Sequence, residues 1–356
     1  MTEQINIETE NFETMAVKAN LSNVEREYFD KLKAELKQIL GGKTFEEIEK
    51  TQDLVLARKA SKKMSEILNF LKTKEVETKG LIIKDAKNPF AEAFRDGGVD
   101  APETIDYVLN FEELADMNAK VYETRGLQKW AEEVKKAKEK LGKMSIEQLE
   151  IIKQEIKEGS IPIIMPGKKI MMETTLEQIK KLRPIFKKEN EEINLAKESN
   201  YSKQLTEKLL EIGNELLLCD IPDEPYILFT DPTQKPRFLN CTVEEQKNAI
   251  TYLNANRTEG NKIYAMNLPE YAAMQTMFAE MVKKRSNEEN VVFSQLRPLD
   301  CGRAFWTSFI SLPVSAKGLI PVANWENLYS ELFFSLADAV NPYPGAGVRL
   351  AERMEI

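Results

Sequence analysis

Apolar side chains recur at helical spacing through the first part of the chain. A capping box of Thr44 and Glu47 precedes a predicted helix. The apolar face of that helix carries Leu54, Leu56, Ala57, Met64, Ile67, Leu68 and Leu71. A shorter helix over residues 25–40 is expected to end at Gly41, because glycine readily adopts the left-handed conformation that closes a helix. Residues 1–20 are polar and acidic and are predicted to form a flexible tail.

A connection and a long helix are expected next. Glycine and proline punctuate residues 75–104, which we interpret as a connecting segment. Residues 111–141 are dense in Lys and Glu, and we predict a helix there with Trp130 on its apolar face.

The following segments complete a predicted helical region. A capping box at Ser145 and Gln148 opens another helix. Two prolines within residues 161–167 forbid a helix, so this segment is an extended crossover or a short strand. A further helical block covers residues 175–218. Residues 21–218 are therefore predicted to form a helical region, either one bundle or a pair of long helical hairpins.

Composition changes after about residue 219. Prolines surround Tyr226–Thr230, which is predicted to be a short strand between loops. Thr242 and Glu245 form a third capping box, and another helix begins at Asn267. These elements indicate a second domain that mixes helices and strands.

The last sixty residues alternate between apolar and polar side chains, as strands do. Strands are predicted within residues 305–312, 328–336 and 347–356. In the second of these, one face carries Leu328, Ser330, Leu332, Phe334 and Leu336, and the other carries Tyr329, Glu331, Phe333 and Ser335. The predicted fold class is α+β, with a helical region followed by a mixed α+β domain over residues 219–356 that has a β-rich end.

Composition excludes several kinds of function. The 356 residues have room for about two domains at roughly 150 residues each. There are 50 Lys and Arg against 58 Asp and Glu, and this net charge of −8 argues against general nucleic-acid binding. The chain has no histidine, which removes Ser–His and Cys–His catalysis and His–metal sites.

Several sites and locations are also not expected. Cys219, Cys241 and Cys301 are odd in number and widely spaced, so they are interpreted as reduced thiols. Acidic residues show no metal-binding spacing, and neither a metal nor another cofactor is expected. There is no run of 18 apolar residues, so no membrane span is expected. The missing secretory signal predicts a cytoplasmic location, with surface delivery by a leaderless route left open.

The predicted strand over residues 328–336 carries the main candidate chemistry. If its leucines face the core, Tyr329 and Phe333 face solvent or a partner. The loop over residues 341–346 would present Tyr343 beside them. Aromatic side chains on a rigid scaffold are low-entropy binding anchors. The alternative is that a sandwich buries both faces of this strand.

Four segments resemble an uncharacterised protein family of candidate-phylum, ultrasmall bacteria. They are Ile161–Gly167 with Glu173-Thr-Thr, Glu224-Pro-Tyr-Ile-Leu, Leu299-Asp with Trp306-Thr, and the ending Ala323-Asn-Trp, Leu332-Phe-Phe and Gly347-Val-Arg-Leu-Ala. The likeness runs from about residue 160 to the end of the chain. The family brings no function that could be transferred.

The C-terminal segment also resembles the variable proteins of diversity-generating retroelements. Their C-type-lectin-like domain ends in a Gly-Phe-Arg-type strand after a diversified stretch, and here Gly347 and Arg349 stand in that frame with Val348 in place of Phe. Such elements mutate adenines, so Asn-type codons become codons that end in a pyrimidine. Residues 340–346 can all be written with such codons, whereas Glu331 cannot. The resemblance implies a C-type-lectin-like domain with a diversified recognition surface.

These observations lead to one hypothesis and two alternatives. We expect a non-enzymatic protein that binds an unknown protein or cell-surface ligand through its C-terminal domain. The helical region would serve as a stalk, docking or oligomerisation element. The expected contact residues are Asn324, Trp325, Asn327, Tyr329, Glu331, Phe333, Ser335, Asn341 and Tyr343. The alternatives are a scaffold that forms homo-oligomers through its helices, and an enzyme that uses carboxylates with Arg297 or Arg303 in a deep pocket.

Overall fold

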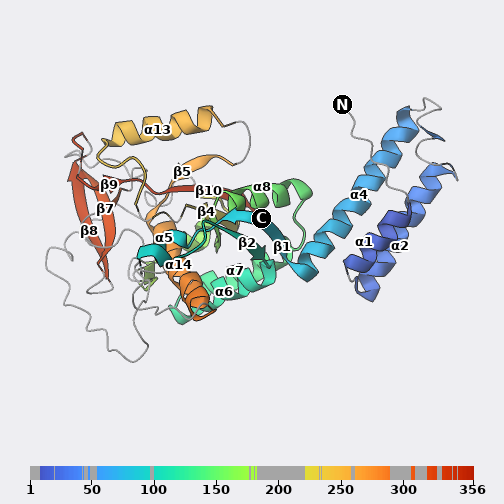
Figure 1. Cartoon of the computed structure of the whole chain (residues 1–356), viewed down its shortest axis with the longest axis horizontal. Coiled ribbons are helices and arrows are strands. Elements are labelled where there is room, and N and C mark those ends of the chain that lie inside the picture. The colour runs from blue at the N-terminus through green and yellow to red at the C-terminus, as the bar shows by residue number, and fades with distance from the viewer. Residues whose placement is uncertain are drawn as a thin grey trace. The chain divides into compact units, whose positions relative to one another are not determined.

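The fold was obtained as a computed structural model of the whole chain (Figure 1). The structure describes residues 9–19, 21–41, 43, 47–48, 54–96, 100–175, 178–179, 181–182, 221–231, 233, 235–257, 261–288, 306–308, 319–326, 331–338, 340–342 and 344–356. The chain forms two compact units. One contains Met1–Ile82, Val108–Glu112 and Glu139–Glu150, and the other contains Ile83–Tyr107, Glu113–Lys138 and Ile151–Ile356. The α+β fold class is as predicted.

Three helices dominate the first unit, namely α1 (Thr9–Lys18), α2 (Asn23–Leu40) and α4 (Leu54–Lys79). Both α1 and α2 pack against α4 (Figure 1). Their shared apolar cluster includes Phe12, Ala16, Phe29, Leu32, Leu36, Ile67 and Leu71, all buried. The helix predicted over residues 25–40 is confirmed and ends at Gly41, which has a φ of 59°. The predicted capping box at Thr44 lies outside the described residues.

The prediction of a flexible tail over residues 1–20 is wrong for α1. Phe12 is fully buried in the apolar cluster of the helical unit, and Ala16 lies one turn further along the same face. Two apolar side chains one turn apart are enough to dock a short helix on its neighbours, although they are too few to dominate a polar composition.

The segment predicted as a connection, residues 75–104, also has structure of its own. It contains the end of α4, strand β1 (Leu81–Lys87) and helix α5 (Ala91–Asp96). Strand β1 joins β2 (Thr104–Leu109) in a two-stranded sheet. Pro89 and Pro102 lie outside these two strands and do not exclude them.

The long helix predicted over residues 111–141 is two helices. Helix α6 (Phe111–Thr124) ends before Gly126, which has a φ of 74°, and α7 (Gln128–Leu141) follows. A left-handed residue cannot continue an α-helix, so the chain turns there. Trp130 is buried as predicted, and its indole N–H donates to the Thr174 hydroxyl at 2.7 Å.

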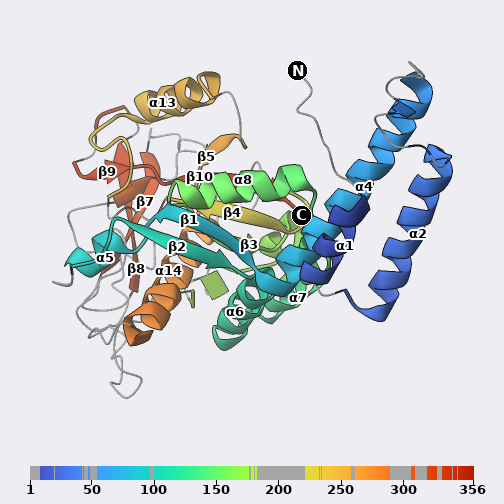
Figure 2. The ribbon, with the colours of Figure 1, turned by 45° about the vertical axis from the view of Figure 1, so that its right-hand side comes forward.

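The second unit is built on a four-stranded antiparallel sheet with the order β3-β4-β10-β5. Its strands are β3 (Ile161–Met165), β4 (Tyr226–Thr230), β10 (Leu350–Glu355) and β5 (Ile263–Ala265). Ile161 of β3 and Ala351 of β10 both lie opposite Thr230 of β4. Helices α8 (Ile146–Lys157) and α14 (Leu268–Glu288) lie on opposite faces of this sheet (Figure 2).

This sheet corrects the predicted domain boundary at residue 219. Strand β3, from the region expected to be helical, pairs along its whole length with β4. The pairing of strands distant in sequence leaves no trace in local periodicity, which is why the boundary was misplaced. Most of the helical block predicted over residues 175–218 lies outside the described residues.

A second sheet, with the order β8-β7-β6-β9, contains the C-terminal candidate segment. Its strands are β6 (Trp306–Ser308), β7 (Leu319–Glu326), β8 (Glu331–Asp338) and β9 (Ala346–Gly347). Helix α13 (Val243–Ala255), which begins at the predicted Thr242–Glu245 capping box, contributes Val243 to a cluster with Ile320 and Val322 of β7. The strand predicted over residues 328–336 is β8, but its described part begins at residue 331.

None of the helices in the described stretches has the length and apolar composition that crossing a bilayer requires.

The close approach of Gly167 to the chain before β4 gives a stability prediction. A Cβ added to Gly167 would lie 2.1 Å from the Asp223 carbonyl oxygen. We expect Gly167→Ala to lower the free energy of unfolding by about 1–3 kcal/mol, because backbone must move to admit the methyl group. Thermal unfolding followed by circular dichroism measures the loss.

A matched control is Gly41→Ala, where a Cβ would have no atom within 4 Å and only the φ of 59° is unfavourable. A smaller loss is expected there, about 1 kcal/mol. Equal losses at the two sites would contradict the proposed clash at Gly167.

Candidate functional site

The predicted contact residues fall on two strands and a loop of the second sheet. Asn324 and Trp325 belong to β7, and Glu331, Phe333 and Ser335 belong to β8. The antiparallel register places Asn324 opposite Phe333, and Ser335 opposite Val322. The environment of these side chains, and all of Asn327, Tyr329 and Tyr343, lie outside the described residues. Asn341 is exposed, and so is its neighbour Val340.

The middle of β7 is covered on both of its faces. Val322 and Ala323 are each fully buried, and Ile320 is nearly so. Successive residues of a strand point to opposite faces, so packing occurs on both sides of the sheet at this point. The alternative left open by the sequence, a sandwich that buries both faces of the strand over residues 328–336, concerns side chains outside the described residues. The outward-facing aromatic row on β8 therefore stays a prediction.

The residues after the exposed loop are a buried frame. Ala346, Gly347, Val348 and Arg349 are all buried. The backbones of Arg237 and Val348 exchange two hydrogen bonds, at 2.9 and 2.8 Å. A Cβ on Gly347 would lie 2.4 Å from the Arg237 carbonyl oxygen, so only glycine fits there.

A second loop, residues 231–240, is fastened to this frame. The Asn240 backbone N–H donates to the Ala346 carbonyl at 3.0 Å, and the Asn240 side-chain oxygen accepts from the Gly345 N–H at 2.9 Å. Phe238 and Asn240 have φ values of 53° and 59°. A bulky residue rarely adopts a positive φ, so the surrounding contacts hold this loop in one strained conformation.

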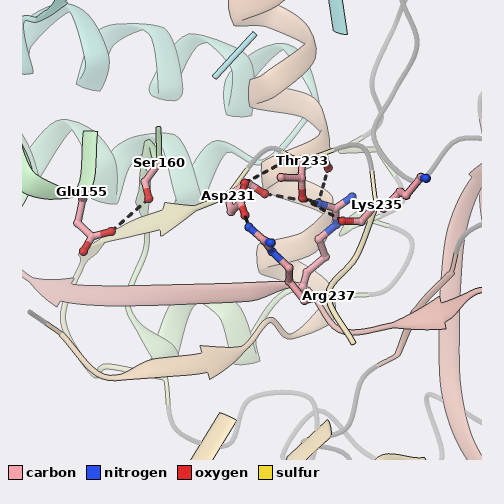
Figure 3. Close-up of polar contacts among 7 residues, drawn as sticks. Glu155, Ser160, Asp231, Thr233, Lys235 and Arg237 are labelled. Carbon is pink, nitrogen blue, oxygen red and sulfur yellow. Dashed lines mark hydrogen bonds and ion pairs between the residues drawn. The ribbon is translucent and has the colours of Figure 1, made fainter. Parts of the chain in front are cut away.

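Arg349 ties the start of the same loop to β10. Its guanidinium is buried and donates to the Thr233 carbonyl at 2.6 Å. In Figure 3 the Arg237 side chain points to Asp231, with which it forms an ion pair. The Asp231 carboxylate also accepts from the Thr233 backbone N–H at 3.2 Å. The described residues of this loop are therefore held by side chains of their own and by the frame.

One face of the four-stranded sheet β3-β4-β10-β5 holds a buried ion pair. The guanidinium of Arg353, on β10, binds both oxygens of Glu270, on α14, at 2.6 and 2.8 Å. The Tyr226 hydroxyl donates to the same carboxylate at 2.6 Å, and the Arg353 guanidinium lies 4.7 Å from the centre of the Tyr264 ring. Burial raises the pKa of Tyr226 well above its usual range, and the negative charge of Glu270 raises it further.

Glu270 also takes part in the cap at the start of α14. Its carboxylate accepts from the Asn267 backbone N–H at 3.1 Å, while the Asn267 side-chain oxygen accepts from the Glu270 N–H at 3.0 Å. This reciprocal pair is a capping box with asparagine as the capping residue. The helix start, the ion pair and the tyrosine are thus held by one carboxylate.

The opposite face of the sheet holds two carboxylates and one guanidinium. Arg257, just beyond α13, binds Glu155 of α8 at 2.8 Å and also binds Glu352 of β10. The Ser160 hydroxyl donates to the second oxygen of Glu155 at 3.1 Å (Figure 3). Burial, and then the charge of Glu155, raise the pKa of Glu352 to about 8.

This second cluster bears on the enzyme alternative. It brings together two carboxylates and an arginine, a donor set that can hold and transfer a proton. The arginine is Arg257, whereas the candidates from the sequence, Arg297 and Arg303, lie outside the described residues. In the part of the chain that the structure describes, no group of three acidic or cysteine side chains is placed to hold a metal ion.

Sequence reasoning missed both charge clusters. The partners are far apart in the chain, and each member alone looks like an ordinary surface charge. The signal was the pair Glu352-Arg353 inside the predicted final strand, where two adjacent charges must point to opposite faces. A charge on each face of a buried strand requires a partner on each face.

A comparison of the chain with protein-family models, with curated proteins and with solved structures found no match.

The ion pair between Glu270 and Arg353 gives a prediction about stability. Arg353→Leu leaves the Glu270 carboxylate buried without its guanidinium, and should cost about 3–5 kcal/mol in the free energy of unfolding. Adding Glu270→Gln to this variant removes the unpaired charge. We therefore expect the double variant to lose less than the sum of the two single variants.

Urea denaturation of the wild type, both single variants and the double variant measures this coupling. The exposed ion pair between Arg95 and Glu103, at 2.8 Å, is the control, and its removal should change stability little. Strict additivity at Glu270 and Arg353 would show that the two side chains do not depend on one another.

Proposed function

We propose that the C-terminal part of this protein is a non-enzymatic recognition domain whose surface includes residues 324–346. Its ligand is a protein or a cell-surface molecule. The observation that carries the proposal is the change from exposed to buried residues at residue 346. Val340, Asn341, Pro342 and Pro344 are exposed, whereas Ala346 to Arg349 are buried.

This contrast separates a displayed loop from the frame that holds it. Exposed residues next to a rigid, buried frame can be exchanged without loss of the fold. Loop 231–240 stabilises the frame through Arg237 and Asn240. A surface held in one conformation before binding loses less entropy when a ligand arrives. These features suit recognition by a surface whose sequence varies.

The order of elements also supports a C-type-lectin-like domain. Such a domain pairs its last strand antiparallel to its first, and carries two helices and a second small sheet between them. In this chain β10 pairs antiparallel to β4, with α13, α14 and the strands of the second sheet between the two in sequence.

The first unit would then serve as an oligomerisation or docking element. Val17, Val24 and Val55 of its helices are 75%, 76% and 66% exposed. These exposed valines are the main support for the second candidate function, a scaffold, because apolar side chains on a helix surface can form the contacts between subunits. Light scattering of the full chain should show an oligomer if they do, and Val17→Asp with Val24→Asp should return it to a monomer.

Diversification has a direct genetic test. The gene should be accompanied by a near-repeat of codons 325–349, with adenines at the positions that vary, beside a reverse transcriptase gene. Sequencing the locus provides the answer. An isolated gene with no such repeat would remove the diversified form of the proposal and leave an invariant binding domain.

The division between display and frame predicts different tolerance to substitution. Asn341→Ala should leave the melting temperature nearly unchanged, because the side chain is exposed. Arg349→Ala should cost about 2 kcal/mol or more, because the buried Arg349 side chain is lost and the Thr233 carbonyl loses a charged donor. Differential scanning calorimetry of the two variants measures both effects. Similar losses at the two positions would argue against a displayed loop on a separate frame.

A further inference from the structure

We propose that Glu155, Glu352 and Arg257 form a proton-dependent latch that holds the last turn of α8 and the chain beyond α13 on strand β10. The latch lies in the second unit and is independent of the proposed recognition function. It joins three segments that are distant in sequence, since Arg257 is separated from Glu155 by 102 residues and from Glu352 by 95.

The geometry places two buried carboxylates on one guanidinium. Glu155 is 3% exposed and Glu352 is 9% exposed, whereas the Arg257 side chain is 23% exposed. Arg257 binds one oxygen of each carboxylate. The second oxygen of Glu155 accepts from Ser160. The second oxygen of Glu352 is buried and has no hydrogen-bond donor among the described residues.

The charges around Glu352 do not balance when both carboxylates are ionised. From α8 and the turn after it come Glu155 and Ser160, and from the chain beyond α13 comes Arg257. Within the sheet, Glu352 lies opposite Phe229 of β4 and Ile263 of β5, which bring no charge. Among the described residues, one positive charge meets two negative charges here, and a net negative charge in a buried place is costly.

A single proton resolves this imbalance. When Glu352 is a carboxylic acid, its second oxygen becomes a donor, and the Glu155 carboxylate beside it is an acceptor. Arg257 then neutralises the one remaining negative charge. The raised pKa of Glu352, about 8, means that the acid form predominates at neutral pH.

Loss of the proton should weaken the latch. Above pH 8 two carboxylates share one guanidinium, and their repulsion favours separation of the α8 end from β10. An opened Glu352 meets water and returns toward its ordinary pKa of about 4.5. The closed state therefore binds the proton more tightly than the open state. Its stability must fall as the pH rises from about 4.5 to about 8, and then level off.

Hydrogen exchange of the full-length protein measures this opening. For amides in residues 151–160 and 261–265, the opening equilibrium constant, corrected for intrinsic exchange, should rise up to about tenfold per pH unit between pH 6 and pH 8. In Glu352→Gln the dependence should disappear, because an amide donates to Glu155 at every pH. An infrared band of a protonated carboxylic acid, present in the wild type at pH 7, should be absent from this variant.

Glu158→Gln is the matched control, since Glu158 is an exposed carboxylate on the turn that follows α8. It should keep the pH dependence of the wild type. If Glu352→Gln does not fold, Glu155→Gln removes the repulsion between the two carboxylates and should reduce the dependence, while the burial of Glu352 maintains part of it. A wild type whose exchange does not change with pH in these segments, or a Glu352→Gln variant that keeps the full dependence, would overturn the latch.

Discussion

Burial of charge on strand β10 is the constraint on which the second unit depends. Arg349, Glu352 and Arg353 are all buried on one strand and its approach. A buried charge without a partner costs several kcal/mol, so each must be met by a group from elsewhere in the chain. The loop after β4 meets Arg349, Arg257 beyond α13 meets Glu352, and α14 meets Arg353. Their contacts with the buried charges of β10 and of Arg349 hold these segments in place.

The buried charges on the two faces of β10 are compensated in different ways. On one face a single guanidinium meets a single carboxylate in a bidentate pair, and a tyrosine completes the shell. Such a pair is electrically balanced and holds its geometry over a wide range of pH. On the other face two carboxylates meet one guanidinium, so balance there depends on a proton. Adjacent residues of one strand thus form one contact that does not depend on pH and one that does.

The sequence predicted best those features whose causes are local. The Thr242–Glu245 capping box and the stop at Gly41 each depend on residues within one helical turn, and both are confirmed. The pairing of β3 with β4 and the Glu270–Arg353 ion pair depend on residues 61 or more positions apart, and no local pattern contains them. Helix α1 was missed because its burial rests on Phe12 and Ala16 in an otherwise polar segment. For the strand predicted over residues 328–336, the outward orientation of Tyr329 and Phe333 remains a prediction.

The position of β10 between β4 and β5 has a consequence for how the chain is made. Strands β3 and β4 leave the ribosome long before the strand that completes their sheet. Until β10 has been made, the edge of β4 that later pairs with it has no neighbouring strand. The charged side chains of α8 and α14 that later lie near β10 are then exposed to solvent or to other chains. Synthesis of this protein therefore includes an interval in which a half-built sheet must be kept from pairing with other chains, and only the arrival of its last strand ends that exposure.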